Sequence, residues 1–84
     1  MDIVENVISK IKEQIKQVKF DNDYLNDVTT VFSRHGYGAA KVFAMGESKE
    51  SKAVLQALDI MEEYNISIQV GTIILSKLNA IVLT

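Results

Sequence analysis

The chain has 84 residues, of which 48% are hydrophobic and 24% charged, a composition typical of one globular domain and unlike that of a disordered segment. It has no cysteine and a single histidine, which excludes disulfides, zinc ribbons, iron–sulfur clusters and thiol catalysis. Nine basic residues against eleven acidic ones leave a net charge of −2, whereas a protein that coats DNA is usually basic.

A chain this short buries only about 60–65% of its unfolded surface, which leaves its stability marginal. Self-association is the expected remedy once disulfides and metals are set aside. No targeting segment is predicted, because charged residues interrupt the apolar N-terminus and polar residues interrupt the stretch 65–84. We therefore expect one cytoplasmic domain over residues 1–84, with no cofactor and no membrane partner.

Apolar residues near the N-terminus recur with the period of a helix, which predicts an amphipathic helix over residues 2–16. A free helix of this kind would expose a large apolar patch, so we expect it to dock on its own domain or on a partner subunit. The docking residues would be Ile3, Val7, Ile11 and Ile15. Around Val18–Phe20 the spacing turns to alternation, which favours a short strand.

Asp21–Asp23 provides N-cap chemistry for a second helix, which is expected to end at His35–Gly38, where glycine permits a left-handed cap. Residues Ala39–Met45 alternate and predict a strand, with Ala40, Val42 and Ala44 on one side. Gly46 would break this strand, and a positive φ there would make Gly46→Val destabilising.

Ser48 is a candidate cap for a third helix that ends near Asn65. Alternating apolar residues then predict a strand over Ile66–Val70, which continues into or is followed by Ile73–Leu75. A tight turn at Ser76–Lys77 would lead into a last strand over Leu78–Leu83. The expected order is helix, short strand, helix, strand, helix, strand, strand.

No recognisable set of nucleophile and base is present, so we do not expect an enzyme. Gly36–Gly38 is read as a helix stop, with a dinucleotide motif as the weaker alternative. His35 favours a capping or surface role over that of a catalytic base, and Ser48 and Ser51 favour caps over phosphate contacts. The basic cluster of the first helix favours a solvated face over a phosphate-contacting surface; it comprises Lys10, Lys12, Lys16 and Lys19.

The segment Gly38–Gly46 resembles the strand and turn of the stage V sporulation protein S family, which has Gly-Ala-Ala, three residues, then Ala-x-Gly. More distantly, Ser51–Val54 is similar to the Ser-Lys-Ala-Val helix start of the Alba family of chromatin and RNA-binding proteins. The resemblance covers about residues 18–84. It implies an α/β (α+β two-layer) fold, a β-α-β-α-β-β sheet with two helices on one face, to which residues 1–17 add an N-terminal helix.

The resemblance also implies a small nucleic-acid-binding or developmental regulatory protein that binds DNA or RNA as a homodimer or larger oligomer. The candidate phosphate contacts are Lys49, Lys52, Lys41, Lys77 and Arg34. Acidic Asp21–Asp23 stands where Alba proteins carry paired lysines, and the last turn holds only Lys77. The alternative is therefore a homo-oligomeric assembly or scaffold module that keeps the fold without binding nucleic acid.

A sheet with helices on one face leaves its other face for solvent or a second subunit. The last predicted strand is apolar on both sides, which is typical of a strand covered on both faces. Ile81 and Leu83 are accordingly the candidate interface residues of a two-fold homo-oligomer.

Overall fold

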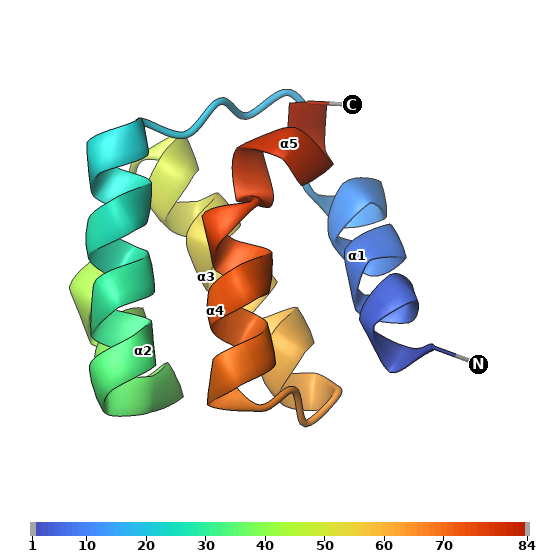
Figure 1. Cartoon of the computed structure of the whole chain (residues 1–84). Coiled ribbons are helices and arrows are strands. Elements are labelled where there is room, and N and C mark those ends of the chain that lie inside the picture. The colour runs from blue at the N-terminus through green and yellow to red at the C-terminus, as the bar shows by residue number, and fades with distance from the viewer. Residues whose placement is uncertain (1, 84) are drawn as a thin grey trace.

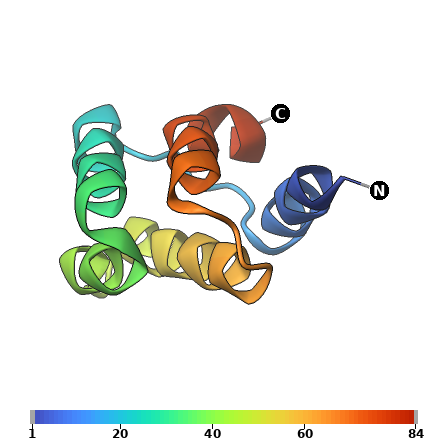
Figure 2. The same cartoon turned by 60° about the horizontal axis from the view of Figure 1, so that its bottom comes forward.

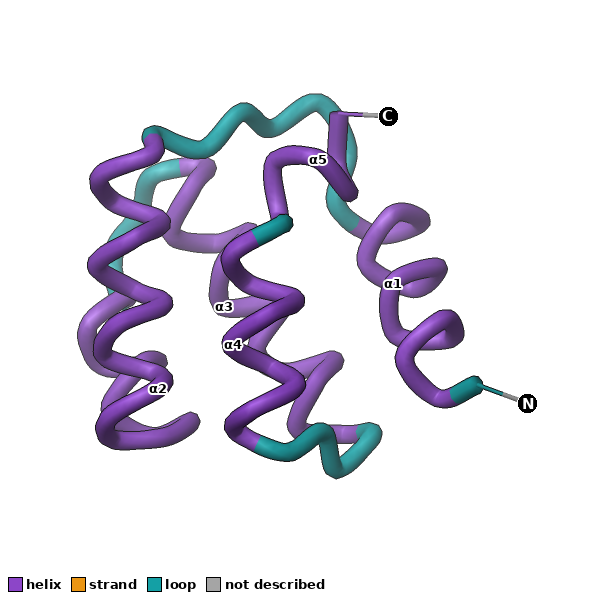
Figure 3. The backbone as a smooth tube through the Cα atoms, in the orientation of Figure 1, coloured by secondary structure: helices purple, strands orange, loops and turns teal. Residues whose placement is uncertain are grey.

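In a computed structural model, which describes residues 2–83, the chain is a bundle of helices with no strand in that range (Figure 3). The helices are α1 (Ile3–Gln14), α2 (Asn22–Ala44), α3 (Lys49–Glu63), α4 (Ile68–Ser76) and α5 (Leu78–Leu83). The predicted sheet of β-α-β-α-β-β order, and with it the α+β two-layer class, is therefore wrong.

The predicted strand over Ala39–Met45 is helical as far as Ala44, where α2 ends, and Met45 is its C-cap. Its inward residues are Ala40 and Ala44, both fully buried and one helical turn apart. Val42, which alternation placed beside them, is exposed. Short windows of apolar residues fit both periods, and here the alanines favour the helix.

The two predicted C-terminal strands are the helices α4 and α5. Their β-branched residues have low intrinsic helix propensity, which is why the sequence favours strands there. Ser67 nevertheless caps α4 by accepting a hydrogen bond from the Val70 amide (3.3 Å), and Ile74 and Leu75 are buried on its inner side. Tertiary burial of this side outweighs the propensity of the isolated segment.

The first predicted helix is confirmed as α1, which Asp2 caps by accepting a hydrogen bond from the Val4 amide (2.9 Å). Val7, Ile11 and Ile15 are buried, whereas Ile3 is exposed. The helix packs against α3 and α5 of its own chain. Of the two expected alternatives, its own domain or a partner subunit, the single chain shows the first.

Between α1 and α2, residues 15–21 form neither helix nor strand, and Gln17 has a positive φ of 59°. Val18 and Phe20 are buried and Lys19 is exposed, so side-chain burial alternates as the sequence predicts. The short strand predicted there is wrong. The backbone of Phe20 is hydrogen-bonded by a side chain instead: its amide donates to Asn79 Oδ1 (2.8 Å), and its carbonyl accepts from Asn79 Nδ2 (2.9 Å). Asn79 thereby fastens the linker to α5.

Substitution of Asn79 with alanine is expected to lower the free energy of unfolding by about 1–3 kcal/mol, because both backbone groups of Phe20 lose their partner. Urea denaturation measures the effect. The control is Asn26→Ala, at an exposed position of α2, which we expect to change the free energy by less than about 0.5 kcal/mol. Equal effects of the two substitutions would contradict the role of Asn79 as a clamp.

Helix α2 doubles back on itself at Gly36, where φ is 87° and ψ is −167°. The rings of Tyr24 and Phe43 stack with centroids 6.5 Å apart. A straight helix would separate these two residues by about 28 Å. The segments 22–35 and 37–44 therefore run in opposite directions, as Figures 1 and 2 show at the end of the molecule coloured cyan to green.

The helices form two layers, which Figure 2 shows most clearly. The first half of α2, then α4, then α1 lie in one layer, and α3 with residues 37–44 lies in the other. The largest fully buried side chains fill the space between the layers and are contributed by the linker and by every helix: Phe20, Phe32, Ile11, Leu58, Met61, Leu75 and Leu78.

The turn between α2 and α3 contains Gly46, which does not have a positive φ. The expected conformational reason for this glycine is therefore wrong. A Cβ atom at Gly46 would lie 2.9 Å from Ser51 Oγ, so glycine is suited to this turn by the close approach of α3.

Candidate interaction surface

Residues 37–45 present an apolar surface that no other part of the described chain covers. Val42 is 69% exposed, Met45 72% and Phe43 45%. Gly38, Val42 and Met45 recur at helical spacing on one side, and Ala39 and Phe43 form the adjacent row. We call these five residues the Val42 surface. Because the opposite side holds Ala40 and Ala44 against the core, the small helix is held in place while this side stays exposed.

Phe43 is held at one edge of the Val42 surface. Its ring stacks on that of Tyr24 with an angle of 19° between the planes. The Tyr24 hydroxyl lies 3.5 Å from Ser51 Oγ, which in turn accepts from Ser48 Oγ at 3.0 Å. The aromatic ring is thus positioned by the first turn of α2 and, through Tyr24, by the first turn of α3.

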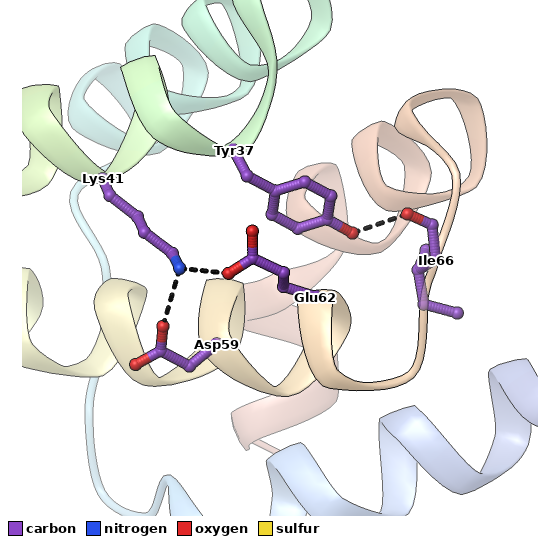
Figure 4. Close-up of polar contacts among 5 residues, drawn as sticks. All are labelled: Tyr37, Lys41, Asp59, Glu62 and Ile66. Atoms are coloured by element: carbon purple, nitrogen blue, oxygen red, sulfur yellow. Dashed lines mark hydrogen bonds and ion pairs between the residues drawn. The ribbon is translucent and has the colours of Figure 1, made fainter.

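Lys41 lies at the other edge and is paired with two carboxylates of α3. Its Nζ pairs with Asp59 at 3.0 Å and with Glu62 (Figure 4). The hydrogen bond to Glu62, followed by that to Asp59, raises the pKa of Lys41 above its ordinary value. The Val42 surface is therefore apolar along its length and bordered by a charge that already has its counter-ions.

Tyr37 anchors the start of the same short helix. Its hydroxyl donates to the Ile66 carbonyl at 2.6 Å, in the link between α3 and α4 (Figure 4). Its ring meets that of Phe32 edge-on, with centroids 4.8 Å apart. Burial, and next the Glu62 carboxylate, raise the pKa of Tyr37 above its ordinary value.

The raised pKa of Tyr37 predicts a loss of stability in alkaline solution. The unfolded chain releases this proton near pH 10 and the folded chain at higher pH, so the free energy of unfolding falls as pH rises through this range. Lys41, with its raised pKa, adds to the fall in the same direction. Denaturation at a series of pH values is expected to show a shallower alkaline fall for Tyr37→Phe than for the wild type.

At neutral pH the same variant should be less stable by about 0.5–1.5 kcal/mol, because the bond to Ile66 is lost. Identical alkaline slopes for the variant and the wild type would show that Tyr37 does not couple ionisation to folding.

The five residues predicted to contact phosphate do not gather in one place. Lys49 and Lys52 are exposed at the start of α3, at the upper end of the molecule in Figure 1, whereas Arg34 precedes the bend of α2 at the lower end. Lys77 joins α4 to α5, and Lys41 is held by Asp59 and Glu62. Nucleic-acid binding through these residues stays a prediction, and a salt-dependent affinity would be its signature.

The two predicted interface residues lie on α5 rather than on a strand. Ile81 belongs to the core and is 9% exposed, whereas Leu83 is 54% exposed near the end of the chain. Their role in self-association stays a prediction, although the strand on which it rested is a helix.

Of the remaining candidates, Ser48 is confirmed as a cap: its side chain accepts a hydrogen bond from the Ser51 amide at 3.0 Å, at the start of α3. His35 is exposed directly before the bend at Gly36. The sequence reasoning missed the Val42 surface because it read 39–45 as a strand. The spacing of Ala40 and Ala44, with Lys41 as the only charge between Gly38 and Gly46, is the signal that could have found it.

Comparisons of the chain with protein-family models, with curated proteins and with solved structures find no match. Within residues 2–83, every helix is too short or too polar to cross a membrane.

Proposed function

We propose that this protein is a non-enzymatic assembly module that forms a homodimer through the Val42 surface. The observation that carries the proposal is the joint exposure of Val42, Phe43 and Met45 on a helix that is otherwise anchored to the core. Contiguous exposed apolar side chains on a small protein are commonly interaction sites.

A second copy of the chain fits this surface for two reasons. Gly38 and Ala39 are small, which permits two such helices to approach closely where they cross. The nearest charge on the helix, Lys41, is paired within its own chain, so a two-fold contact does not bring two unpaired Lys41 ammonium groups together.

The expected dimer is weak. Stable interfaces bury about 800 Å² on each partner, and three large side chains with two small ones fall short of that area. We therefore expect a reversible dimer with a dissociation constant of about 10 μM to 1 mM.

Sedimentation or light scattering over this concentration range tests the proposal. The variant Val42→Glu with Met45→Glu is expected to stay monomeric throughout, because each carboxylate would have to be buried unpaired. Two controls place glutamate at exposed apolar sites elsewhere, Ile73 on α4 (55% exposed) and Leu83 on α5 (54% exposed). Both controls should dimerise as the wild type does.

Two outcomes would overturn the proposal. One is a wild-type chain that remains monomeric up to about 1 mM, the upper limit of the expected range. The other is a dimer that Leu83→Glu disrupts and the Val42–Met45 variant does not, which would place the interface on α5.

A further inference from the structure

Helix α2 is interrupted by a single residue. Positions 35 and 37 both belong to helical segments, and Gly36 alone has non-helical angles. Its φ of 87° with ψ of −167° lies in a region that only glycine occupies readily. A change of these two angles to ordinary helical values would make residues 22–44 one continuous helix.

The straight form has a local advantage. Each helix end leaves as many as four backbone groups without a partner inside the helix, and the bend creates two such ends in the middle of α2. A continuous helix pairs these groups with one another. The local backbone therefore does not require the bend, and Gly36 only permits it.

Contacts between the two sides of Gly36 hold the bent form together. Phe43 stacks on Tyr24, Tyr37 packs edge-on against Phe32, and Asn79 binds the backbone of Phe20. Helix α1 also packs on α3 and α5, and the first half of α2 lies beside α4. A straight chain would break all of these contacts and expose the core of both parts.

In a dimer of straight chains, these contacts would form between the two chains. Residues 2–35 of each chain then pack on residues 37–83 of the other. We propose that Gly36 is the hinge of such an exchange, through which this chain forms a swapped dimer with α2 continuous. The bent monomer and the swapped dimer share their contacts, so the conformation preferred at residue 36 sets the balance between them.

Substitution of Gly36 tests this directly, because an L-residue disfavours the bent conformation. The Cβ atom of alanine would meet no atom closer than Ile68 Cδ1 at 3.7 Å, so the effect comes from the backbone and not from a clash. Gly36→Ala is expected to shift the balance towards the dimer by about tenfold to a hundredfold for each of the two hinges. The comparison variant is Gly38→Ala, where a Cβ has nothing within 4 Å. Gly38 belongs to the Val42 surface, but its substitution leaves the backbone of Gly36 unchanged, so the fraction of swapped dimer should equal that of the wild type.

The natural chain lacks cysteine, so spin labels can be placed on the exposed pair Asp23→Cys and Glu47→Cys. Dilution with excess unlabelled chain before refolding restricts the measured distances to those within one chain. In Gly36→Ala the two labels should move apart to about 30 Å or more, as a continuous helix requires. In Gly38→Ala they should stay as close as in the wild type.

The oligomeric size of Gly36→Ala and the distance between its two spin labels together test the proposal. A Gly36→Ala protein that remains a folded monomer with the short distance would overturn the proposal. Should this variant fail to fold, the wild type refolded at about 1 mM decides, a concentration high enough for association to compete. The refolded wild type should then contain a dimer that persists after dilution. The proposal would be overturned if every dimer present dissociated on dilution. The Val42→Glu with Met45→Glu variant separates the two proposals, because a swapped dimer survives it.

Discussion

Replacement of Phe32 with alanine is expected to lower the free energy of unfolding by about 3–5 kcal/mol, the largest effect of any single substitution we consider. Phe32 is 0% exposed and lies between the bend of α2 and helix α4. Its removal would leave a cavity and would deprive Tyr37 of its aromatic neighbour. Because domains of this size are marginally stable, the variant should be partly unfolded at room temperature.

Phe43→Ala is the matched control, since it removes the same side chain from a position that is 45% exposed. It should lose mainly the stack with Tyr24, worth about 0.5–1.5 kcal/mol. Chemical denaturation at low protein concentration, where the Val42 surface is unoccupied, measures both variants. Similar losses of unfolding free energy in the two variants would show that Phe32 contributes no more to the core than an exposed phenylalanine does.

Gly71→Ala is expected to destabilise the protein by about 1–3 kcal/mol, even though alanine normally favours a helix. A Cβ atom at Gly71 would lie 2.7 Å from both Cε2 and Cζ of Phe32, which is closer than carbon atoms can approach. Because Phe32 is fully enclosed, its ring cannot move away without disturbing the core. Glycine at this position therefore permits the close contact between α2 and α4.

Gly38→Ala is the natural comparison for this substitution, and it should stabilise the monomer by up to about 1 kcal/mol, because its Cβ would stand in open space on a helix.

In a Phe32→Leu background, which frees room beside α4, the cost of Gly71→Ala should shrink measurably. Thermal and urea unfolding of the four chains complete this cycle. Stabilisation by Gly71→Ala in the wild-type background would refute the tight contact.

Both proposed dimers depend on the bend at Gly36. It turns residues 37–44 back against the first half of α2, so that Ala40 and Ala44 face the core and Val42 faces outward. A straight α2 would carry the same residues away from their own core. The two proposals describe different dimers, one reversible through a surface and one exchanged through a hinge, and their variants distinguish them.

The first helix and the starts of the next two helices were predictable from sequence. Apolar residues at helical spacing identified α1, and the side chains of Asp21 and Ser48 cap α2 and α3, as their residue types predicted. These features are local: a cap depends on one side chain and the next few amides, and an amphipathic helix shows its period within a few turns. The exposure of the Val42 surface was not predicted, because it depends on which side of a short helix meets α3.

What the sequence by itself determined is the extent of α1 and the starts of α2 and α3. Only the tertiary structure decided that residues 39–44, 68–76 and 78–83 are helices and not strands. In those segments, alternation of apolar residues and β-branched side chains favoured strands, but no partner strand exists within residues 2–83 to complete a sheet. Backbone groups that cannot pair between strands must pair within a helix, and burial of Ala40, Ile74 and Leu78 in the shared core stabilises that choice.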